Sequence, residues 1–356
     1  MGGKDNAERV RLMAPRRRAL SLGILGALLI LLLAFAPDVL LVIFAGLLFA
    51  VFFSGGGEWL ARRLGIGRNW GIGLFLLILV LALAGISLGF APFAVDQFEQ
   101  LSQKVPEAFQ SVRERLEQYS WGEKLLERAT PGALMSEGSG GAAAGAVTAT
   151  FGALGNFVIM LFIGLYVALD PKTYRKGLLA LLAPSVHAEG EDVLSKASDT
   201  LANWLVAQMM AMAVVGILTW LGLWLVGVPL APALGLIAAL LAFIPNIGPI
   251  IAAVPAVLLG LSEGQTTALL VVGVYVGVQA LESYVITPLI QQERVSLPPA
   301  LIISSQLLMG ILFGILGLAL ATPLAALGLT LVRETYVRRY LEKEEAELRV
   351  QQPAHR

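Results

Sequence analysis

The chain has 356 residues, of which 57% are apolar and only 14% are charged. Soluble domains carry about 45–50% apolar and about 25% charged residues, so this composition excludes an ordinary soluble globule. Lys and Arg total 25, as do Asp and Glu, and the chain has no cysteine. Disulfides, thiol catalysis and cysteine metal sites are therefore excluded. The histidines, His187 and His355, both lie in polar segments, which leaves none for a site within a membrane.

Apolar residues gather in about eight blocks, and we predict that each is a membrane segment. Most are longer than the roughly 20 residues that cross the hydrocarbon core. The sequence therefore predicts an all-α, polytopic helical membrane protein. The blocks cover residues 19–36, 38–56, 70–92, 146–169, 204–227, 231–259, 266–290 and 299–332.

Basic residues predict how the chain is oriented. Residues 1–18 form a basic N-terminus with the layout of a signal peptide, but a second apolar block follows the first after only Pro37 and Asp38. We interpret the first block as a retained helix. With the N-terminus in the cytoplasm, 19 of the 25 Lys and Arg residues fall on the cytoplasmic side. This bias predicts a multi-pass protein of the bacterial inner membrane with both termini in the cytoplasm.

After the first three helices, which occupy 19–92, we expect an extracytoplasmic arm at 93–145. Apolar side chains recur there every three or four residues from Val95 to Tyr119, which is the pattern of an amphipathic helix. We expect Pro106 to begin a second helix and residues 138–141 to form a flexible linker. The apolar stripe either packs on the membrane domain or pairs the subunits of a homo-oligomer.

The rest of the chain divides into a transport core and a tail. The core covers 146–332, and a charged cytoplasmic tail covers 333–356. Within the core, residues 171–202 mix proline, charge and a short apolar run, so we expect them to lie at the membrane interface. Four polar residues inside apolar blocks are expected to make hydrogen bonds between helices. These are Gln208, Gln306, Ser304 and Ser305.

The apolar run 231–259 is interrupted at its centre. Pro245, Asn246, Gly248 and Pro249 lie close together there, and two prolines four residues apart prevent a regular helix. In lipid, a broken helix persists only where protein or a water-filled cavity satisfies the freed backbone groups. Such breaks indicate the binding site of a transporter.

Two segments are too long for a single crossing. At 1.5 Å per residue, 231–259 and 299–332 would extend roughly 44 and 51 Å as helices, against a hydrocarbon core of about 30 Å. The second contains Gly310, Gly314 and Gly317, and the two share a weak repeat of Pro and Leu positions. Each is a candidate re-entrant hairpin, which makes an inverted repeat and places Arg294 inside. The alternative is eight crossings with a parallel repeat.

Glu282 is the main candidate for chemistry. It lies in the apolar block 266–290, between Gln279 and Ser283, and a carboxylate inside a membrane usually marks an ion or proton path. The plainer interpretations are a carboxylate at the water boundary, or one held in place by hydrogen bonds for packing. Asn246 either contacts a polar solute or caps the interrupted helix. No phosphate-binding loop, nucleophile–base pair or metal cluster is present, so we expect no enzyme and no cofactor.

Several stretches resemble the autoinducer-2 exporter family. The run Phe-Ile-Pro-Asn-Ile-Gly-Pro at 243–249 resembles that family's Pro-x-Ile-Gly-Pro signature. Residues 279–288, with Val-Ser-Leu-Pro-Pro at 295–299, are similar to its next block, and 310–323 are similar to its last. The similarity covers 20–335. It implies a permease-like transporter, in a family whose members are described as furanone exporters or as sodium or lithium/proton antiporters.

Three functions follow as hypotheses. The first is a secondary transporter that exports a small polar metabolite or an autoinducer-2-like signal, with the break and Gln279–Ser283 on the transport path. The second is a cation/proton antiporter that uses Glu282. The third is a non-transporting scaffold that acts through the outer arm. The expected partners are the lipid bilayer, a small molecule or cation and further copies of the chain, with no nucleic acid.

Overall fold

The computed structural model describes residues 23, 26–27, 35–117, 141–286 and 297–341. Every regular element in these ranges is a helix, and six helices are long and apolar enough to cross a membrane. The predicted all-α, polytopic membrane fold is therefore confirmed. The first predicted block, 19–36, lies almost entirely outside the described residues, as do Arg294 and most of the linker and tail.

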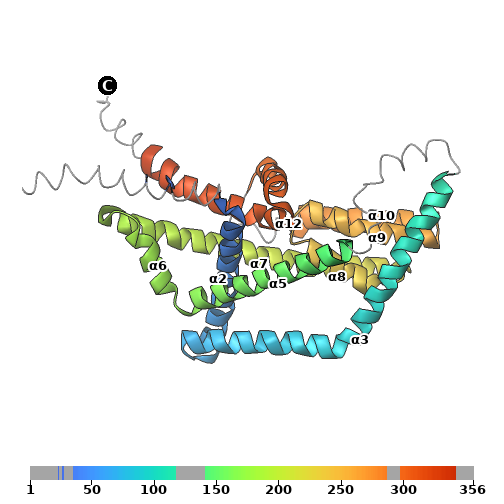
Figure 1. Ribbon diagram of the computed structural model, residues 1–356, viewed down its shortest axis with the longest axis horizontal. Coiled ribbons are helices and arrows are strands. Elements are labelled where there is room, and N and C mark those ends of the chain that lie inside the picture. The colour runs from blue at the N-terminus through green and yellow to red at the C-terminus, as the bar shows by residue number, and fades with distance from the viewer. Residues whose placement is uncertain (1–22, 24–25, 28–34, 118–140, 287–296, 342–356) are drawn as a thin grey trace, which may run out of the picture. The chain divides into compact units, whose positions relative to one another are not determined.

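Within 35–117, 141–286 and 297–341, the helices follow one another with short connections (Figure 1). Several end close to the limits of the predicted blocks, although α2, α3, α5 and α7 begin or end well beyond them. The elements are α2 (Pro37–Leu64), α3 (Arg68–Glu117), α5 (Gly141–Leu169), α6 (Pro171–Ala180), η1 (Pro184–Val186), α7 (His187–Leu225), α8 (Ala231–Leu241), α9 (Ile247–Glu263), α10 (Gln265–Leu281), η2 (Glu282–Ile286), α12 (Pro299–Val332) and η3 (Arg333–Leu341).

The chain forms two compact units, and each is built from separate stretches of sequence. Unit 1 comprises residues 1–76, 156–205 and 294–356, and unit 2 comprises 77–155 and 206–293. Helices α3, α5 and α7 each contribute residues to both units.

In unit 1, glycines allow the helices to approach closely. A Cβ on Gly46 of α2 would lie 2.6 Å from Cγ2 of Ile163, and one on Gly164 of α5 would lie 2.6 Å from Cβ of Phe49. Both distances are shorter than real side chains tolerate, so only glycine fits at this crossing. Small residues at such crossings are typical of helices that pack within lipid.

A polar ladder joins α7 to the C-terminal helix in unit 1. Lys196 Nζ lies 2.6 Å from Glu334 Oε2 and 2.9 Å from Asp192 Oδ2. One turn further along α7, the hydroxyls of Thr200 and Thr330 are 3.1 Å apart. The pairs lie 138 and 130 residues apart in sequence, so they fix the register between distant elements.

Unit 2 has an apolar core to which the arm contributes. Leu101 of α3 is buried with Leu223, Leu234 and Leu259, and Val105 packs against the same cluster. One face of the arm therefore packs on the membrane helices, as the first of the two interpretations expected.

The prediction that Pro106 begins a new helix is wrong, because α3 runs unbroken from Arg68 to Glu117. Proline removes one ladder hydrogen bond. The burial of Leu101 and Ala108 on either side of it outweighs that loss.

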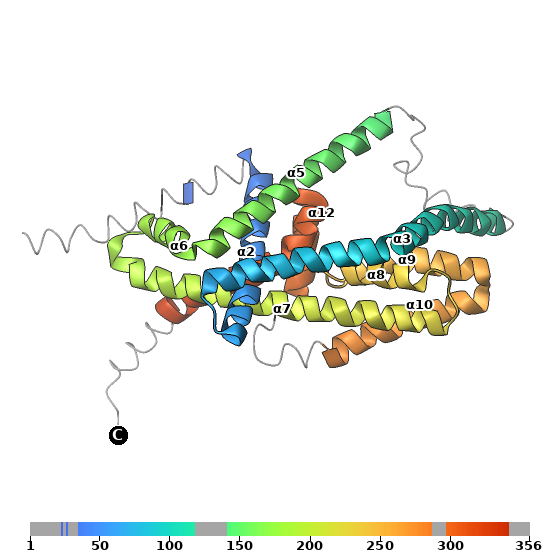
Figure 2. The same cartoon turned by 90° about the horizontal axis from the view of Figure 1, so that it is seen from below.

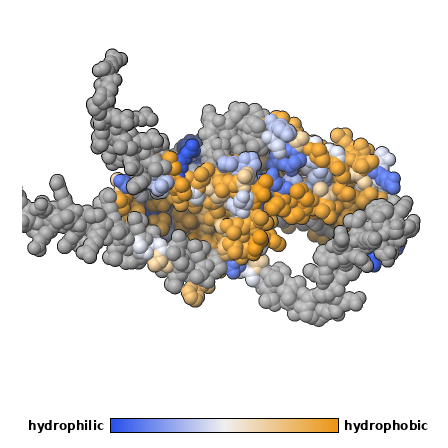
Figure 3. Space-filling view, turned by 90° about the horizontal axis from the view of Figure 1, so that it is seen from above, coloured by the Kyte–Doolittle hydropathy of each residue, from blue (hydrophilic) through white to orange (hydrophobic). Residues whose placement is uncertain are grey.

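Much of the apolar surface remains uncovered. Figure 3 shows hydrophobic side chains over most of the coloured surface in that view, and many large apolar residues of the six candidate spans are exposed. Contiguous exposure of this kind is incompatible with water. It is what lipid-facing helices require.

Candidate functional site

The predicted break is a sharp reversal between two short helices of unit 2. α8 ends at Leu241 and α9 begins at Ile247. The Ile247 N–H donates to the carbonyl of Pro245 at 2.8 Å, with φ 66° and ψ −48° at Asn246. This is a γ-turn of the rare kind with positive φ, which is strained. Segment 231–259 is thus a helical hairpin rather than one straight helix, while its re-entry into a bilayer remains a prediction.

Each residue of the break has a distinct role in the turn. A Cβ on Gly248 would overlap the carbonyl oxygen of Leu241, so glycine lets the two helices meet. The Gly248 N–H donates to the carbonyl of Ile244 at 2.9 Å. Asn246 is exposed and its side chain makes no capping hydrogen bond, so the prediction that it caps the helix is wrong.

Gln208 of α7 supports the start of the turn. Its side-chain Nε2 donates to the carbonyl of Ala242 at 2.7 Å, and the side chain is buried. Helix ends leave carbonyls without partners, and this amide satisfies one of them from a neighbouring helix. The expectation of an interhelical hydrogen bond is confirmed for Gln208. It is wrong for Ser304 and Ser305, which donate to carbonyls of their own helix.

α10 packs antiparallel on α9 and contributes a buried tyrosine. A Cβ on Gly260 would lie 3.1 Å from Cα of Ala268, which shows how close the two helices are near the connecting turn. Further along, the Tyr275 hydroxyl donates to the carbonyl of Ala252 at 3.0 Å. The α8–α10 helices lie side by side in Figures 1 and 2.

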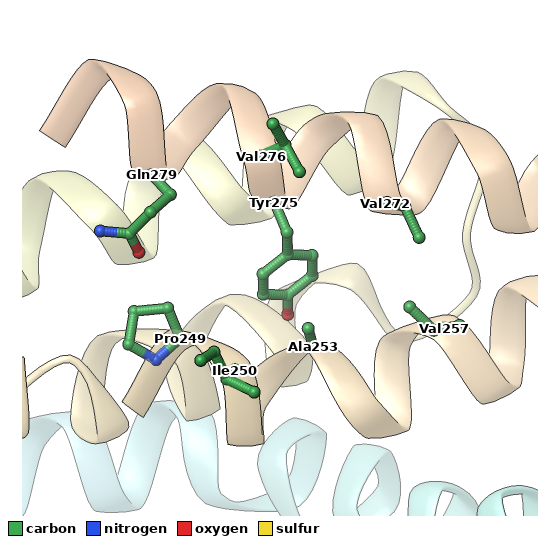
Figure 4. A pocket seen from close by; sticks show the side chains of 8 residues that line it. All are labelled: Pro249, Ile250, Ala253, Val257, Val272, Tyr275, Val276 and Gln279. Atoms are coloured by element: carbon green, nitrogen blue, oxygen red, sulfur yellow. The ribbon is translucent and has the colours of Figure 1, made fainter. Parts of the chain in front are cut away.

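Between α9 and α10 lies a groove of about 260 Å³. Figure 4 shows Pro249 of the break at one end, opposite Gln279, with Tyr275 pointing across toward α9. The walls are otherwise aliphatic. The lining residues are Pro249, Ile250, Ala253, Val257, Val272, Tyr275, Val276 and Gln279.

The polar end of α10 continues from this groove. Gln279 Nε2 donates to Glu282 Oε2 at 3.0 Å, and the Glu282 side chain is half-buried. From Glu282 to Ile286 the chain forms a π-helix, a widened turn that is frequent at functional sites. Ser283 is exposed.

The structure thus brings together the residues of two separate predictions. Pro249 and Gln279 line one groove, and Glu282 bonds to Gln279. Asn246 and Ser283 are exposed and are not among the residues that line the groove.

Sequence reasoning missed Tyr275. Its hydroxyl lies in an apolar helix and needs a partner. On α9, Pro255 has no N–H to donate to the carbonyl of Ile251, so the helix hydrogen bonds are interrupted beside Ala252, which accepts from Tyr275. An internal proline in one apolar block and a tyrosine in the next were the available signals.

The second long segment is also bent back on itself. Gly314 of α12 has φ 61° and ψ −143°, and a Cβ on Gly317 would overlap the carbonyl oxygen of Met309. Eight residues of straight helix would separate these positions by about 12 Å. The parts 299–313 and 315–332 therefore form a V, although the whole segment is long enough for one crossing.

The two hairpins share a layout. Pro232 and Pro299 lie in the first turns, and the breaks at Asn246 and Gly314 follow 14 and 15 residues later. Pro255 and Pro323 then lie nine residues beyond each break. In both hairpins, a Cβ on the glycine shortly after the break would overlap the carbonyl oxygen of the residue five positions before the break. The weak sequence repeat therefore corresponds to a structural one.

A multi-pass helical chain with broken hairpins and a polar-ended groove is consistent with the architecture of a membrane transporter. The sequence pattern of the protein family named "AI-2E family transporter" matches residues 22–337. The chain belongs to this family, and it is a membrane transporter.

Three relatives show how far the similarity extends. YrrI of Bacillus subtilis, named "Putative transport protein", is 27% identical over 281 residues, 76% of this chain and 78% of YrrI. YueF of the same organism is 32% identical over 184 residues, 51% of this chain and 50% of YueF. TqsA of Escherichia coli, named "AI-2 transport protein", is 27% identical over 173 residues, 48% of this chain and 50% of TqsA. The match to YueF and TqsA therefore spans half of each.

Proposed function

We propose that this protein is a secondary transporter that exports a small polar metabolite, with an autoinducer-2-like signal as its substrate class. The observation that carries the proposal is the reversal at Pro245–Pro249 beside the groove that ends at Gln279. Broken helices at the middle of a membrane protein supply backbone dipoles to a solute. The name of TqsA supports this choice of substrate.

The groove suits a solute that is small and only partly polar. Its aliphatic walls would exclude water and cover the carbon skeleton, while the Gln279 amide would bond a hydroxyl or carbonyl oxygen at one end. Asn246 would contact the solute where it enters or leaves, because its amide is exposed at the turn.

A second candidate function is exchange of sodium or lithium for protons. It is favoured by Glu282, a half-buried carboxylate hydrogen-bonded to the neutral amide of Gln279. A carboxylate in this setting binds either a proton or a cation, but not both at once. Such competition is the basis of an antiporter.

Everted membrane vesicles distinguish the two functions. If the protein exports a furanone signal, vesicles take it up without added sodium, and Gln279→Leu reduces the uptake. If it is an antiporter, sodium drives proton release, and Glu282→Gln abolishes that release. Thr266→Ala is the control, because Thr266 is exposed at the start of α10 and does not line the groove. If neither activity appears while residues 93–117 capture a partner, the chain is a scaffold and both proposals fail.

We also propose that the protein works as a homo-oligomer in the bacterial inner membrane with both termini in the cytoplasm. On α3, Leu88, Val95 and Phe109 are exposed at multiples of seven residues, while Leu101 packs inward. A seven-residue repeat suits pairing between helices. Mass photometry in detergent tests the subunit number, and Val95→Glu with Phe109→Glu should lower it.

A further inference from the structure

We propose that the turn between α2 and α3 binds the headgroups of anionic phospholipids. The candidate spans Asp38–Leu64 and Arg68–Gly85 leave only residues 65–67 between them. Two consecutive crossings joined by three residues must reverse at the membrane surface, since the hydrocarbon core ends where both spans end. The turn therefore lies at headgroup level.

Two exposed tryptophans flank this turn. Trp59 near the end of α2 is 56% exposed, and Trp70 at the start of α3 is 79% exposed. Both would be costly in water. Tryptophan is enriched at the membrane–water interface, where the ring meets acyl chains and the indole N–H meets headgroups.

Two arginines supply the charge for an anionic partner. Arg62 and Arg63 are exposed in the last turn of α2, and neither is ion-paired to a carboxylate in the described part of the chain. The guanidinium of Arg63 lies 5.8 Å from the ring centre of Trp59, which holds it beside the tryptophan. Arginine binds phosphate through two parallel hydrogen bonds.

The third arginine of the turn is used differently. Arg68 Nε donates to Glu58 Oε1 at 2.9 Å, and its Nη2 donates to Ser54 Oγ at 3.2 Å. The charges of Arg68 and Glu58 cancel, and the ion pair joins α2 to α3. The turn then carries a net positive charge from Arg62 and Arg63 alone, which complements the phosphodiester of an anionic lipid.

The platform is rigid before any lipid arrives. A Cβ on Gly71 would overlap the carbonyl oxygen of Gly57 and would lie 2.6 Å from Cβ of Ala61. Ile72 is fully buried. Because Gly71 follows Trp70 and Ala61 precedes Arg62, this packing fixes the backbone that carries the aromatic and basic side chains and reduces the ordering cost of binding.

The chain has no cysteine, so a single fluorophore can be placed at the turn through Gly67→Cys. The labelled full-length protein is reconstituted in phosphatidylcholine vesicles that contain nitroxide-labelled phosphatidylglycerol or nitroxide-labelled phosphatidylcholine. We expect the fluorophore to be quenched more strongly by the labelled phosphatidylglycerol than by the labelled phosphatidylcholine. Each basic residue near a charged surface changes its attraction by about fivefold, so Arg62→Gln and Arg63→Gln should each lower the lipid preference by about that factor.

Two controls make the result specific to the turn. Lys172→Gln with Lys176→Gln on α6 removes the same charge from exposed positions elsewhere in unit 1 and should leave the preference unchanged. Arg62→Lys with Arg63→Lys keeps the charge and the fold, and should retain part of the preference. Equal quenching by the two lipids, or an equal loss in the α6 variant, would overturn the proposal. Neither readout depends on transport, so it is independent of the proposed function.

Discussion

The reversal between α8 and α9 depends on two residues with different requirements. Asn246 adopts a positive φ that most side chains avoid, and Gly248 allows no side chain at all. A residue held in such a strained region costs about 1–3 kcal/mol. The turn persists because Gln208 and the packing of α8 on α9 hold it from outside.

Gly248→Ala should disrupt the hairpin. The new Cβ would overlap the Leu241 carbonyl, and a backbone clash cannot be relieved by rotating a side chain. We expect a destabilisation of about 3 kcal/mol or more, measured as a lower melting temperature in detergent together with lost transport. Gly273→Ala is the matched control, since nothing lies within 4 Å of a Cβ there. A Gly248→Ala protein as stable as this control would contradict the structure.

Asn246 separates the backbone role of the turn from a solute contact. Asn246→Gly keeps the positive φ and removes only the amide, so the melting temperature should stay the same or rise. Transport should fall about tenfold or more if the amide bonds the solute, given about 1.5 kcal/mol per lost hydrogen bond. Unchanged transport would leave the residue with a turn-forming role alone.

Residue-level predictions succeeded where local chemistry decides the outcome. Two prolines four residues apart, with Asn and Gly between them, disfavour a continuous helix more strongly than the single Pro106 does in α3, so the position of the reversal could be predicted. The hydrogen-bond acceptors of Gln208 and Tyr275 depend on how four helices, α7 to α10, align, which no local pattern specifies. For Asn246 the sequence left a solute contact and a helix cap as alternatives, and in the γ-turn its side chain makes no capping hydrogen bond.

At the scale of elements, the interruptions within helical segments could be predicted better than the residues at which helices begin and end. The lengths of 231–259 and 299–332 exceeded a single crossing, and both segments are bent. By contrast, α3 extends from Arg68 through the predicted arm to Glu117. Hydropathy marks where lipid ends rather than where a helix ends, so the sequence divided one helix into a span and an arm.

The ladder between α7 and the C-terminal helix should be measurable as a coupling. A double-mutant cycle of Lys196→Met and Glu334→Gln isolates the ion pair from other losses. We expect a measurable favourable coupling, because Glu334 is largely buried while Lys196 is more exposed. Additive effects on the unfolding free energy would show that the pair contributes nothing.

The start of α6 should respond to acid. The Thr173 hydroxyl, followed by its backbone N–H, bonds the Asp170 carboxylate and holds its pKa below the usual range. A lowered pKa means that the cap is complete above the unfolded value near about 4 and is lost as pH falls through the folded value. Hydrogen exchange at Thr173, corrected for intrinsic rates, should therefore quicken in acid. Asp170→Ala should show the same quickening at neutral pH, and Asp170→Asn should show less.

At the scale of the whole molecule, the open question is how the two hairpins cross the bilayer. Re-entry of both predicts that position 294 faces the cytoplasm, whereas eight crossings place it outside. Arg294→Cys in this cysteine-free chain should react with an impermeant maleimide only in everted vesicles. Lys172→Cys serves as the cytoplasmic reference. Labelling of position 294 in intact cells alone would exclude the pair of hairpins.

The discontinuous make-up of unit 1 has a consequence for biosynthesis. Unit 2 is complete once residue 293 has been synthesised, but unit 1 also needs 294–356. Helix α2 must therefore wait in the membrane, without its partner α12, while most of the chain is still being translated. Membrane chaperones that shelter unpaired helices should matter more for this half of the protein, and truncation at residue 293 should expose α2 to quality-control proteases while unit 2 stays folded.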